Sequence, residues 1–158
     1  MENNTLIVGV DPGITGALVA LLDGKPCAWL PMPTVQQGKS SRVNAAAVAA
    51  WLHELPSAPT MAYIEDVHAM PSQGVTSMFT FGHAAGVVTG VIAGLEIPYT
   101  LVSPQRWKRS AGLAGTQKDA ARSLAVTLWP GWRALDTKVR GQALADAALI
   151  ANTAARQT

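Results

Sequence analysis

Short apolar runs, separated by segments rich in glycine, proline and polar residues, recur along this chain of 158 residues. Continuous apolar runs of about five residues bounded by turn residues are typical of buried strands. The pair Asp23-Gly24 lies between two such runs and favours a hairpin, so the chain is expected to open with antiparallel strands. The predicted strands are residues 6–10, 15–22, 26–30, 61–65 and 99–103.

Helices are predicted where apolar residues recur at intervals of three or four. One of them begins at Thr116, with Asp119 at the spacing of a capping box. Residues 31–41 and 130–140 are expected to be loops or irregular. The predicted helices are residues 42–55, about 76–95, a short turn opened by Pro104, the helix beginning at Thr116, and about 142–155. This order predicts an α/β fold with a mixed five-stranded sheet flanked by helices.

Glycine occupies every fourth position in part of the predicted helix over 76–95. Each glycine lowers helix propensity by roughly 1 kcal/mol relative to alanine, so close packing against this face is expected in return. Packing within the chain is the preferred interpretation, and a dimer contact is the alternative. The nearly apolar stretch 84–95 is too short to cross a bilayer and is interpreted as a buried helix. The glycines are Gly82, Gly86, Gly90 and Gly94.

Composition favours one compact domain over residues 1–158, because 49% of the residues are apolar and only 14% are charged. Cys27 has no second cysteine to pair with, which fits a reducing compartment. A cytoplasmic location is therefore expected, in the host cytoplasm if the chain is phage-encoded. The first five residues contain no basic region, so neither a signal peptide nor a membrane partner is expected.

Charge is unevenly distributed along the chain. Residues 1–96 contain three Lys or Arg against seven Asp or Glu, a net charge of −4, whereas residues 97–158 contain nine against three, a net charge of +6. A basic C-terminal part is free to contact a polyanion, which fits nucleic-acid binding through phosphate groups.

Three acidic residues end or interrupt apolar segments. Asp11 follows the run 6–10, Glu65 ends the run that begins at Met61, and Asp146 lies within a segment of small apolar residues. Removing such charges from water costs on the order of several kcal/mol per ion unless a cation compensates. Divalent metals compensate several carboxylates at once, and hard oxygen ligands favour magnesium or manganese. A site of this kind can hydrolyse a phosphodiester bond.

These acids lie in motifs that resemble the RuvC family of Holliday-junction resolvases, within the RNase H-like superfamily. The matching segments are GVDPGITG at 9–16, YIEDV at 63–67 and ALADAALIA at 143–151, with a helix of small residues over 82–95. They occur in the family's order and cover nearly the whole chain. The resemblance implies an RNase H-like fold and a homodimer acting in DNA recombination and repair. It also implies an endonuclease that nicks two strands of a four-way DNA junction.

The resemblance also implies the roles of individual residues. Asp11, Glu65 and Asp146 match the metal ligands, for two Mg²⁺ ions that Mn²⁺ is expected to replace. Lys118 matches a lysine near the scissile phosphate, and Lys108 is a plausible match for another basic residue. The implied catalytic set is Asp11, Glu65, Asp146 and Lys118.

Two positions depart from the family pattern. Ala143 stands where the family has a fourth acid, so Gln142, one helical turn before Asp146, is the candidate replacement through its carbonyl oxygen or a metal-bound water. An uncharged ligand predicts weaker affinity for the second ion or dependence on manganese. Asp136 is a less favoured substitute.

The second departure is His68, which stands where the family has an aromatic residue that stacks on DNA bases. It can stack or donate to a phosphate, and an exposed histidine without a role is the alternative interpretation. Trp107 is expected to anchor its helix in the core while the basic residues beside it stay solvated. The predicted DNA-contacting residues are His68, Arg106, Lys108, Arg109, Lys118 and Arg122.

Three other functions fit parts of the sequence. A nuclease with broader specificity would cut forks and flaps as well as four-way junctions. A junction-binding protein without cleavage would explain the absence of the fourth acid. The segment 9–24 also resembles the phosphate-binding hairpin of sugar kinases and actin, but those proteins need two such domains.

Overall fold

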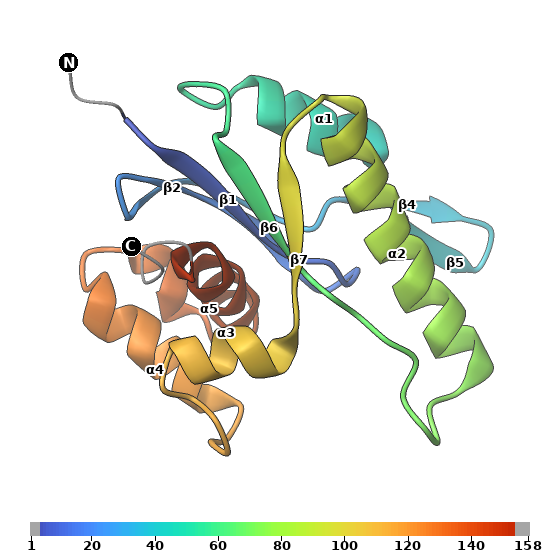
Figure 1. Ribbon diagram of the computed structural model, residues 1–158. Coiled ribbons are helices and arrows are strands. Elements are labelled where there is room, and N and C mark those ends of the chain that lie inside the picture. Colours follow the sequence, from blue (N-terminus) through green and yellow to red (C-terminus); the bar gives the residue numbers. More distant parts are fainter. Residues whose placement is uncertain (1–3, 154–158) are drawn as a thin grey trace.

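A mixed five-stranded sheet forms the centre of the computed structural model, which describes residues 4–153 (Figure 1). The strand order is β3-β2-β1-β6-β7. β1 pairs with β2, and β2 with β3, in antiparallel fashion, whereas β1–β6 and β6–β7 are parallel pairs. The strands are β1 (Leu6–Asp11), β2 (Ala17–Leu22), β3 (Lys25–Pro31), β6 (Met61–Glu65) and β7 (Tyr99–Val102). The predicted mixed sheet flanked by helices is therefore confirmed.

Helices cover both faces of this sheet (Figure 1). α1 and α2 pack on one face, and α4, η1 and α5 pack on the other. The short α3 follows β7, with Ser103 as its N-cap and a proline at its start. The helices are α1 (Ala45–His53), α2 (Val75–Gly94), α3 (Pro104–Ser110), α4 (Asp119–Leu128), the 3-10 helix η1 (Arg133–Asp136) and α5 (Lys138–Asn152).

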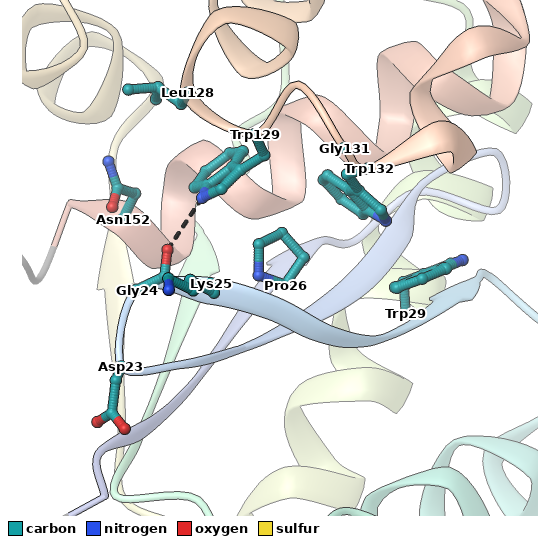
Figure 2. Close-up of a pocket in the computed structure, with 10 residues that line it drawn as sticks. All are labelled: Asp23, Gly24, Lys25, Pro26, Trp29, Leu128, Trp129, Gly131, Trp132 and Asn152. Atoms are coloured by element: carbon teal, nitrogen blue, oxygen red, sulfur yellow. Dashed lines mark hydrogen bonds between the residues drawn. The ribbon is translucent and has the colours of Figure 1, made fainter.

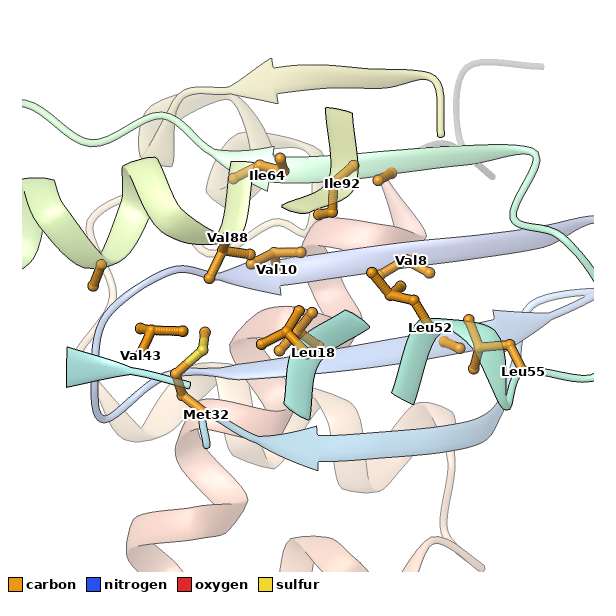
Figure 3. Packing of buried hydrophobic residues seen from close by; sticks show 14 of the residues in the cluster. Val8, Val10, Leu18, Met32, Val43, Leu52, Leu55, Ile64, Val88 and Ile92 are labelled. Carbon is orange, nitrogen blue, oxygen red and sulfur yellow. The ribbon is translucent and has the colours of Figure 1, made fainter. Parts of the chain in front are cut away.

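Alternation along the strands divides the core into two layers. Val8, Val10 and Leu18 point toward α1 and α2, where they pack with Val88 and Ile92 (Figure 3). The alternate residues of β2 point to the opposite face and pack against α4 and α5. Because the side chains of a strand alternate between its faces, β1 and β2 are buried on both sides, which explains their continuous apolar runs.

Close approach between β1 and α5 fixes the position of the last helix. A Cβ atom at Gly9 would overlap the carbonyl oxygen of Ala147 and lie 2.7 Å from the backbone nitrogen of Ala151. Only a residue without a side chain permits this contact between backbones. The small residues of α5, including Ala148, are buried in the same layer and keep the helix against the sheet.

One segment predicted as a loop is ordered as a second, two-stranded sheet. Residues 34–37 form β4 (Thr34–Gln37) and residues 40–43 form β5 (Ser40–Val43), paired antiparallel around Gly38 at φ +60°. The loop prediction for residues 31–41 is therefore wrong. The hairpin is almost entirely polar, so it carries no hydrophobic alternation that would have predicted strands.

The last helix begins earlier than predicted, at Lys138 instead of Gln142. Asp146 consequently lies near the middle of α5 and not in its first two turns. The last two residues of the predicted helix, Ala154 and Ala155, lie outside the described residues. The capping box of α4 is also wrong, because the Thr116 hydroxyl donates to the carbonyl of Leu113 at 2.6 Å and α4 begins at Asp119 without a side-chain cap.

α2 is much more exposed than predicted. Each of its four spaced glycines faces open space, because a Cβ there would meet no described atom within 4 Å beyond the adjoining turns of the helix, so packing of this stripe within the chain is wrong. By length and composition α2 also resembles a membrane-spanning helix, with mean hydropathy 1.4 and 17% of its apolar stretch buried. An apolar helix that packs on the core with just one face has its other face available to a partner surface.

Substitution of Gly9 by alanine tests the contact between β1 and α5. We expect Gly9→Ala to lower the free energy of unfolding by about 3 kcal/mol, because the added methyl group displaces the α5 backbone. Urea unfolding measures this change. Gly131→Ala is the control, because a Cβ there meets nothing within 4 Å, and it should leave stability nearly unchanged. Equal stability of the two variants would contradict the close approach.

Candidate active site

Two of the predicted acids end adjacent parallel strands. Asp11 is the last residue of β1 and Glu65 is the last residue of β6, and the preceding residues Val10 and Ile64 are paired in register. Since parallel strands end at the same edge of a sheet, both carboxylates lie at that edge. This arrangement follows from the sheet order.

The third acid reaches the same edge from α5. Asp146 directly precedes Ala147, whose carbonyl oxygen lies against Gly9 of β1. Because Gly9 is two residues before Asp11, the close packing of α5 places the Asp146 side chain near the strand ends. The side chains of all three acids are partly buried.

Glu65 and Asp146 lie near enough to Asp11 for their charges to raise its pKa. Burial and then the charges of Glu65 and Asp146 raise the pKa of Asp11 to about 7, against a smaller lowering by a hydrogen bond from the backbone of Gly13. Burial and then the charge of Glu65 raise the pKa of Asp146 to about 6. Burial also raises the pKa of Glu65. Burial thus favours the protonated form of all three acids, and like charges nearby add to this effect for Asp11 and Asp146.

Trp107 connects the core to Glu65. Its indole Nε1 donates to Glu65 Oε2 at 2.6 Å, and its ring is buried among Val102, Ala121 and Ile150. The predicted anchoring role is confirmed, but the hydrogen bond to a candidate ligand was missed. It joins residues 42 positions apart, so no local pattern in the sequence signals it. This bond lowers the pKa of Glu65 and fixes one of its oxygens.

Gln142 is the neighbour of Asp146 on α5. Its Nε2 donates to Asp146 Oδ1 at 3.1 Å, and its Oε1 is buried without a hydrogen-bond partner among the described residues. A buried amide oxygen without a donor is costly, so this atom is available to a cation or to a water molecule. Ala143, in contrast, packs against the apolar cluster beneath α5. Asp136 pairs with Arg133 at 2.8 Å, which gives its carboxylate a separate partner.

Two of the predicted lysines lie beside these acids. Lys108 and Lys118 both lower the pKa of Asp146, and Lys108 also lowers that of Glu65. Together with Gln142 and Asp146, they line a hollow of about 190 Å³. Both lysines are exposed, so their ammonium groups are accessible to an anion that enters this hollow.

A second hollow borders the site on the side of α2. It has a volume of about 410 Å³ and extends from Asp11 and the turn after β1 to the first turns of α2. Its α2 wall carries hydroxyl groups from Thr76, Ser77 and Thr80. The carboxylates therefore lie between two hollows, one lined by lysines and one lined by hydroxyl groups.

The other predicted DNA contacts have different environments. Arg106 and Arg109 are exposed on α3, and exposed His68 lies 3.1 Å from the carboxylate of Asp66. The Arg122 guanidinium instead donates to the carbonyl oxygens of Leu135 at 2.8 Å and Asp136 at 3.1 Å. The structure thus places Arg122 in a structural role that holds η1 against α4. Its role as a DNA contact stays a prediction.

The donor set fits hard divalent cations, since carboxylate oxygens and the unpaired amide oxygen of Gln142 are suitable ligands. Within residues 4–153, however, no three acidic, histidine or cysteine side chains come close enough together to hold one ion. Glu65 and Asp146 are each bound to a protein donor, Trp107 or Gln142.

A larger cavity, of about 700 Å³, lies at the opposite end of the sheet, where β1 begins (Figure 2). Trp129 donates to the carbonyl of Gly24 at 2.9 Å, and Trp132 packs edge to face against Trp29 at 5.4 Å. These contacts hold the β2–β3 turn against the segment between α4 and η1. The cavity is thus separated from the carboxylates by the length of β1.

Comparison with known proteins identifies the fold. The structure of Thermus thermophilus RuvC in complex with a Holliday junction substrate matches with a TM-score of 0.67 and 20% identity, over 97% of this chain and 94% of that chain. A second T. thermophilus RuvC structure matches with a TM-score of 0.61 and 18% identity, over 96% and 94%. At this level of identity the similarity establishes a RuvC-type, RNase H-like fold.

A curated protein matches part of the sequence. The chloroplastic Holliday junction resolvase MOC1 of Chlamydomonas reinhardtii is 32% identical over 90 residues, which are 56% of this chain and 10% of that protein. The chain therefore spans about a tenth of the length of this relative. No protein-family model matches the chain.

Stability against pH tests the burial of the carboxylates in metal-free protein. Because the pKa of Asp11 rises from 3.8 to about 7 on folding, the folded state binds more protons than the unfolded state between these values. The free energy of unfolding therefore falls as the pH rises from about 4 to 7. We expect Asp11→Asn to remove this loss and to be more stable than the parent at pH 8, by on the order of 2 kcal/mol, with little difference at pH 4.

Urea unfolding in EDTA at pH 4 and pH 8 measures the effect. Glu54→Gln is the control, because this acid is exposed and remote from the three carboxylates. A metal-free Asp11→Asn protein less stable than the parent at pH 8 would contradict the proposed electrostatic penalty.

Proposed function

We propose that this chain, which has the RuvC fold, is a metal-dependent endonuclease that hydrolyses phosphodiester bonds in four-way DNA junctions. The observation that carries the proposal is the convergence of Asp11, Glu65 and Asp146 at one end of the sheet, with raised pKa values. Such acids are poorly compensated by the protein alone and are suited to cations. One matching structure holds a Holliday junction substrate and the curated relative is a Holliday junction resolvase, which supports this substrate.

The proposed ligands are the three carboxylates, with Gln142 Oε1 as a neutral fourth donor. Two divalent cations held by these residues would activate a water molecule as the nucleophile and would stabilise the leaving 3′ oxygen. Loss of the protons from Asp11 and Asp146 accompanies binding, because carboxylates bind metal in their charged form. Trp107 holds Glu65 in place by its hydrogen bond, so it is a positioning residue and not a catalytic one.

Lys108 and Lys118 are proposed to bind the phosphate at the cleavage site. Both lysines line the same hollow as Asp146, and a positive charge there stabilises the extra negative charge of the transition state. Arg106, Arg109 and His68 extend this surface as phosphate contacts. Their exposure supports the proposal, and the sequence-based roles remain predictions.

A homodimer is proposed because two symmetric nicks require two active sites. The exposed face of α2 supports this arrangement, since its four glycines leave a flat strip with open space above each Cα. Helices approach one another closely along such strips. A second copy of this chain is the proposed partner of that face, and no membrane is required.

A protein that binds junctions without cutting them is the second candidate function. It is favoured by Ala143, which packs against the core where the family pattern has an acid, and by the bond between Gln142 and Asp146. A nuclease with broader specificity, which also cuts forks and flaps, is the third candidate.

Cleavage assays separate these functions. The protein is incubated with labelled four-way, three-way, flap and linear duplex DNA in magnesium, manganese or calcium. We expect paired, symmetric nicks in the four-way junction in magnesium or manganese, and at least a hundredfold slower cleavage by Asp11→Asn, on the order of the loss of one catalytic group. Glu54→Gln is the matched control and should cut like the parent.

Other outcomes assign the remaining candidates. Tight junction binding in calcium, with no cleavage in any metal, would establish binding alone. Similar rates on all four substrates would exclude junction specificity.

A charge added at Gln142 tests the proposed metal site. We expect Gln142→Glu to lower the magnesium concentration for half-maximal cleavage by about tenfold, because a carboxylate binds magnesium more strongly than an amide. A metal titration of the cleavage rate measures this. Asn152→Asp adds the same charge at the far end of α5, where Asn152 lines the tryptophan-rich cavity, and should leave the titration unchanged. An unchanged midpoint for Gln142→Glu would exclude this residue from the metal site.

A further inference from the structure

The β4–β5 hairpin is the one large element of residues 4–153 that adds little to the core. All four residues of β4 are exposed, and in β5 only Val43 is buried. An isolated two-stranded hairpin is at best marginally stable in water, so this segment depends on its attachment to the rest of the chain. Its polar side chains are therefore available to contact a partner molecule.

The base of the hairpin is attached next to the active-site carboxylates. The Met32 backbone N–H donates to the carbonyl of Gly16 at 3.0 Å, and Gly16 belongs to the turn that follows Asp11. Across the sheet, Asp11 pairs with Ala17, and Ala17 pairs with Pro31. The hairpin thus leaves the same sheet edge that carries the carboxylates, on the side away from α3.

The hairpin also rests on the α2 side of the site. The Arg42 guanidinium lies over the ring of Phe79, 5.7 Å from its centroid. Phe79 is on the first turns of α2, next to Met78 and Thr80, and Thr80 lines the hollow beside Asp11. Figure 1 shows the hairpin alongside α2, outside the main sheet.

The charge of the hairpin is positive although its half of the chain is acidic. Residues 1–96 contain three basic residues, and two of them, Lys39 and Arg42, lie in the hairpin, which has no acid. Neither forms an ion pair with another residue of the described chain. Lys39 is exposed next to the turn. The third basic residue, Lys25, lies at the opposite end of the sheet.

Basic groups therefore flank the carboxylates on both sides. Lys108 and Lys118 line one hollow, and Arg42 of the hairpin lies over Phe79 of α2, next to Thr80, which lines the other. A duplex that crosses the sheet edge presents phosphates to both sides, because each of its strands carries a charged backbone. Hydroxyl and amide groups of the hairpin, such as those of Gln37 and Ser40, are also suitable phosphate donors.

We infer that the β4–β5 hairpin is a second DNA-backbone contact, which binds phosphates of a junction arm on the α2 side of the active site. This inference rests on the proposed function, because it requires DNA at the carboxylates. It adds a contact outside the acids and the α3–α4 basic residues. Since its donors reach phosphates and not base edges, the hairpin adds affinity without sequence preference.

The test is the salt dependence of junction binding, in an Asp11→Asn background that prevents cleavage. For Lys39→Gln/Arg42→Gln we expect about tenfold weaker binding and a slope of log K against log[salt] that is shallower by about 2, one for each lost phosphate contact. Lys25→Gln is the matched control, a basic residue of the same half at the other end of the sheet, and should change neither value. Lys39→Arg/Arg42→Lys should restore the parent slope.

Three results would overturn the inference. If the parent binds and cuts junctions while Lys39→Gln/Arg42→Gln binds with the parent affinity and slope, the hairpin does not contact DNA and the proposed function stands. If the double variant loses the parent's oligomeric mass in light scattering, the hairpin contacts a second copy of the chain instead. If the parent neither binds nor cuts branched DNA, the proposed function fails and the hairpin inference fails with it.

Discussion

The contact between the backbones of β1 and α5 is the constraint on which the site depends. At Gly9, the strand has no side chain, and the carbonyl of Ala147 and the nitrogen of Ala151 occupy the space that a Cβ would fill. This contact brings Asp146, on the preceding residue of α5, to the edge where β1 and β6 end. A larger residue at position 9 would separate the helix from the sheet and one carboxylate from the other two.

The close packing that brings the three carboxylates to one edge also makes their charged forms unfavourable. Burial raises the pKa of all three, repulsion between like charges further raises those of Asp11 and Asp146, and the available protein donors offset the cost only in part. Trp107 and Gln142 each satisfy one oxygen, while Lys108 and Lys118 act from the solvent side. The site therefore retains unfavourable free energy that the binding of cations can release.

Sequence patterns predicted the sheet and the three acids because both depend on local signals. Apolar runs marked β1, β2 and β6, and each acid interrupted such a run. The glycine stripe of α2 was assigned to the interior because periodicity alone does not tell which surface a helix face meets. The β4–β5 hairpin lacked apolar alternation, so nothing in its composition distinguished strand from loop.

Contacts between residues far apart in sequence were beyond such reasoning. The bond from Trp107 to Glu65 and those from Arg122 to the η1 carbonyls depend on the packing of α3 and α4. Gln142 was identified only because a resemblance drew attention to the position next to it. α5 also starts at Lys138, earlier than predicted, so Asp146 lies in the interior of a long helix and not near its end.

The β4–β5 hairpin is closed at its base, where the Asn44 backbone N–H donates to the carbonyl of Pro33 at 2.8 Å. The chain thus leaves and re-enters the domain at nearly one point. Insertions or deletions beyond that point alter the reach of the hairpin without moving the sheet edge. The length of this element can therefore change independently of the sheet edge that carries the carboxylates.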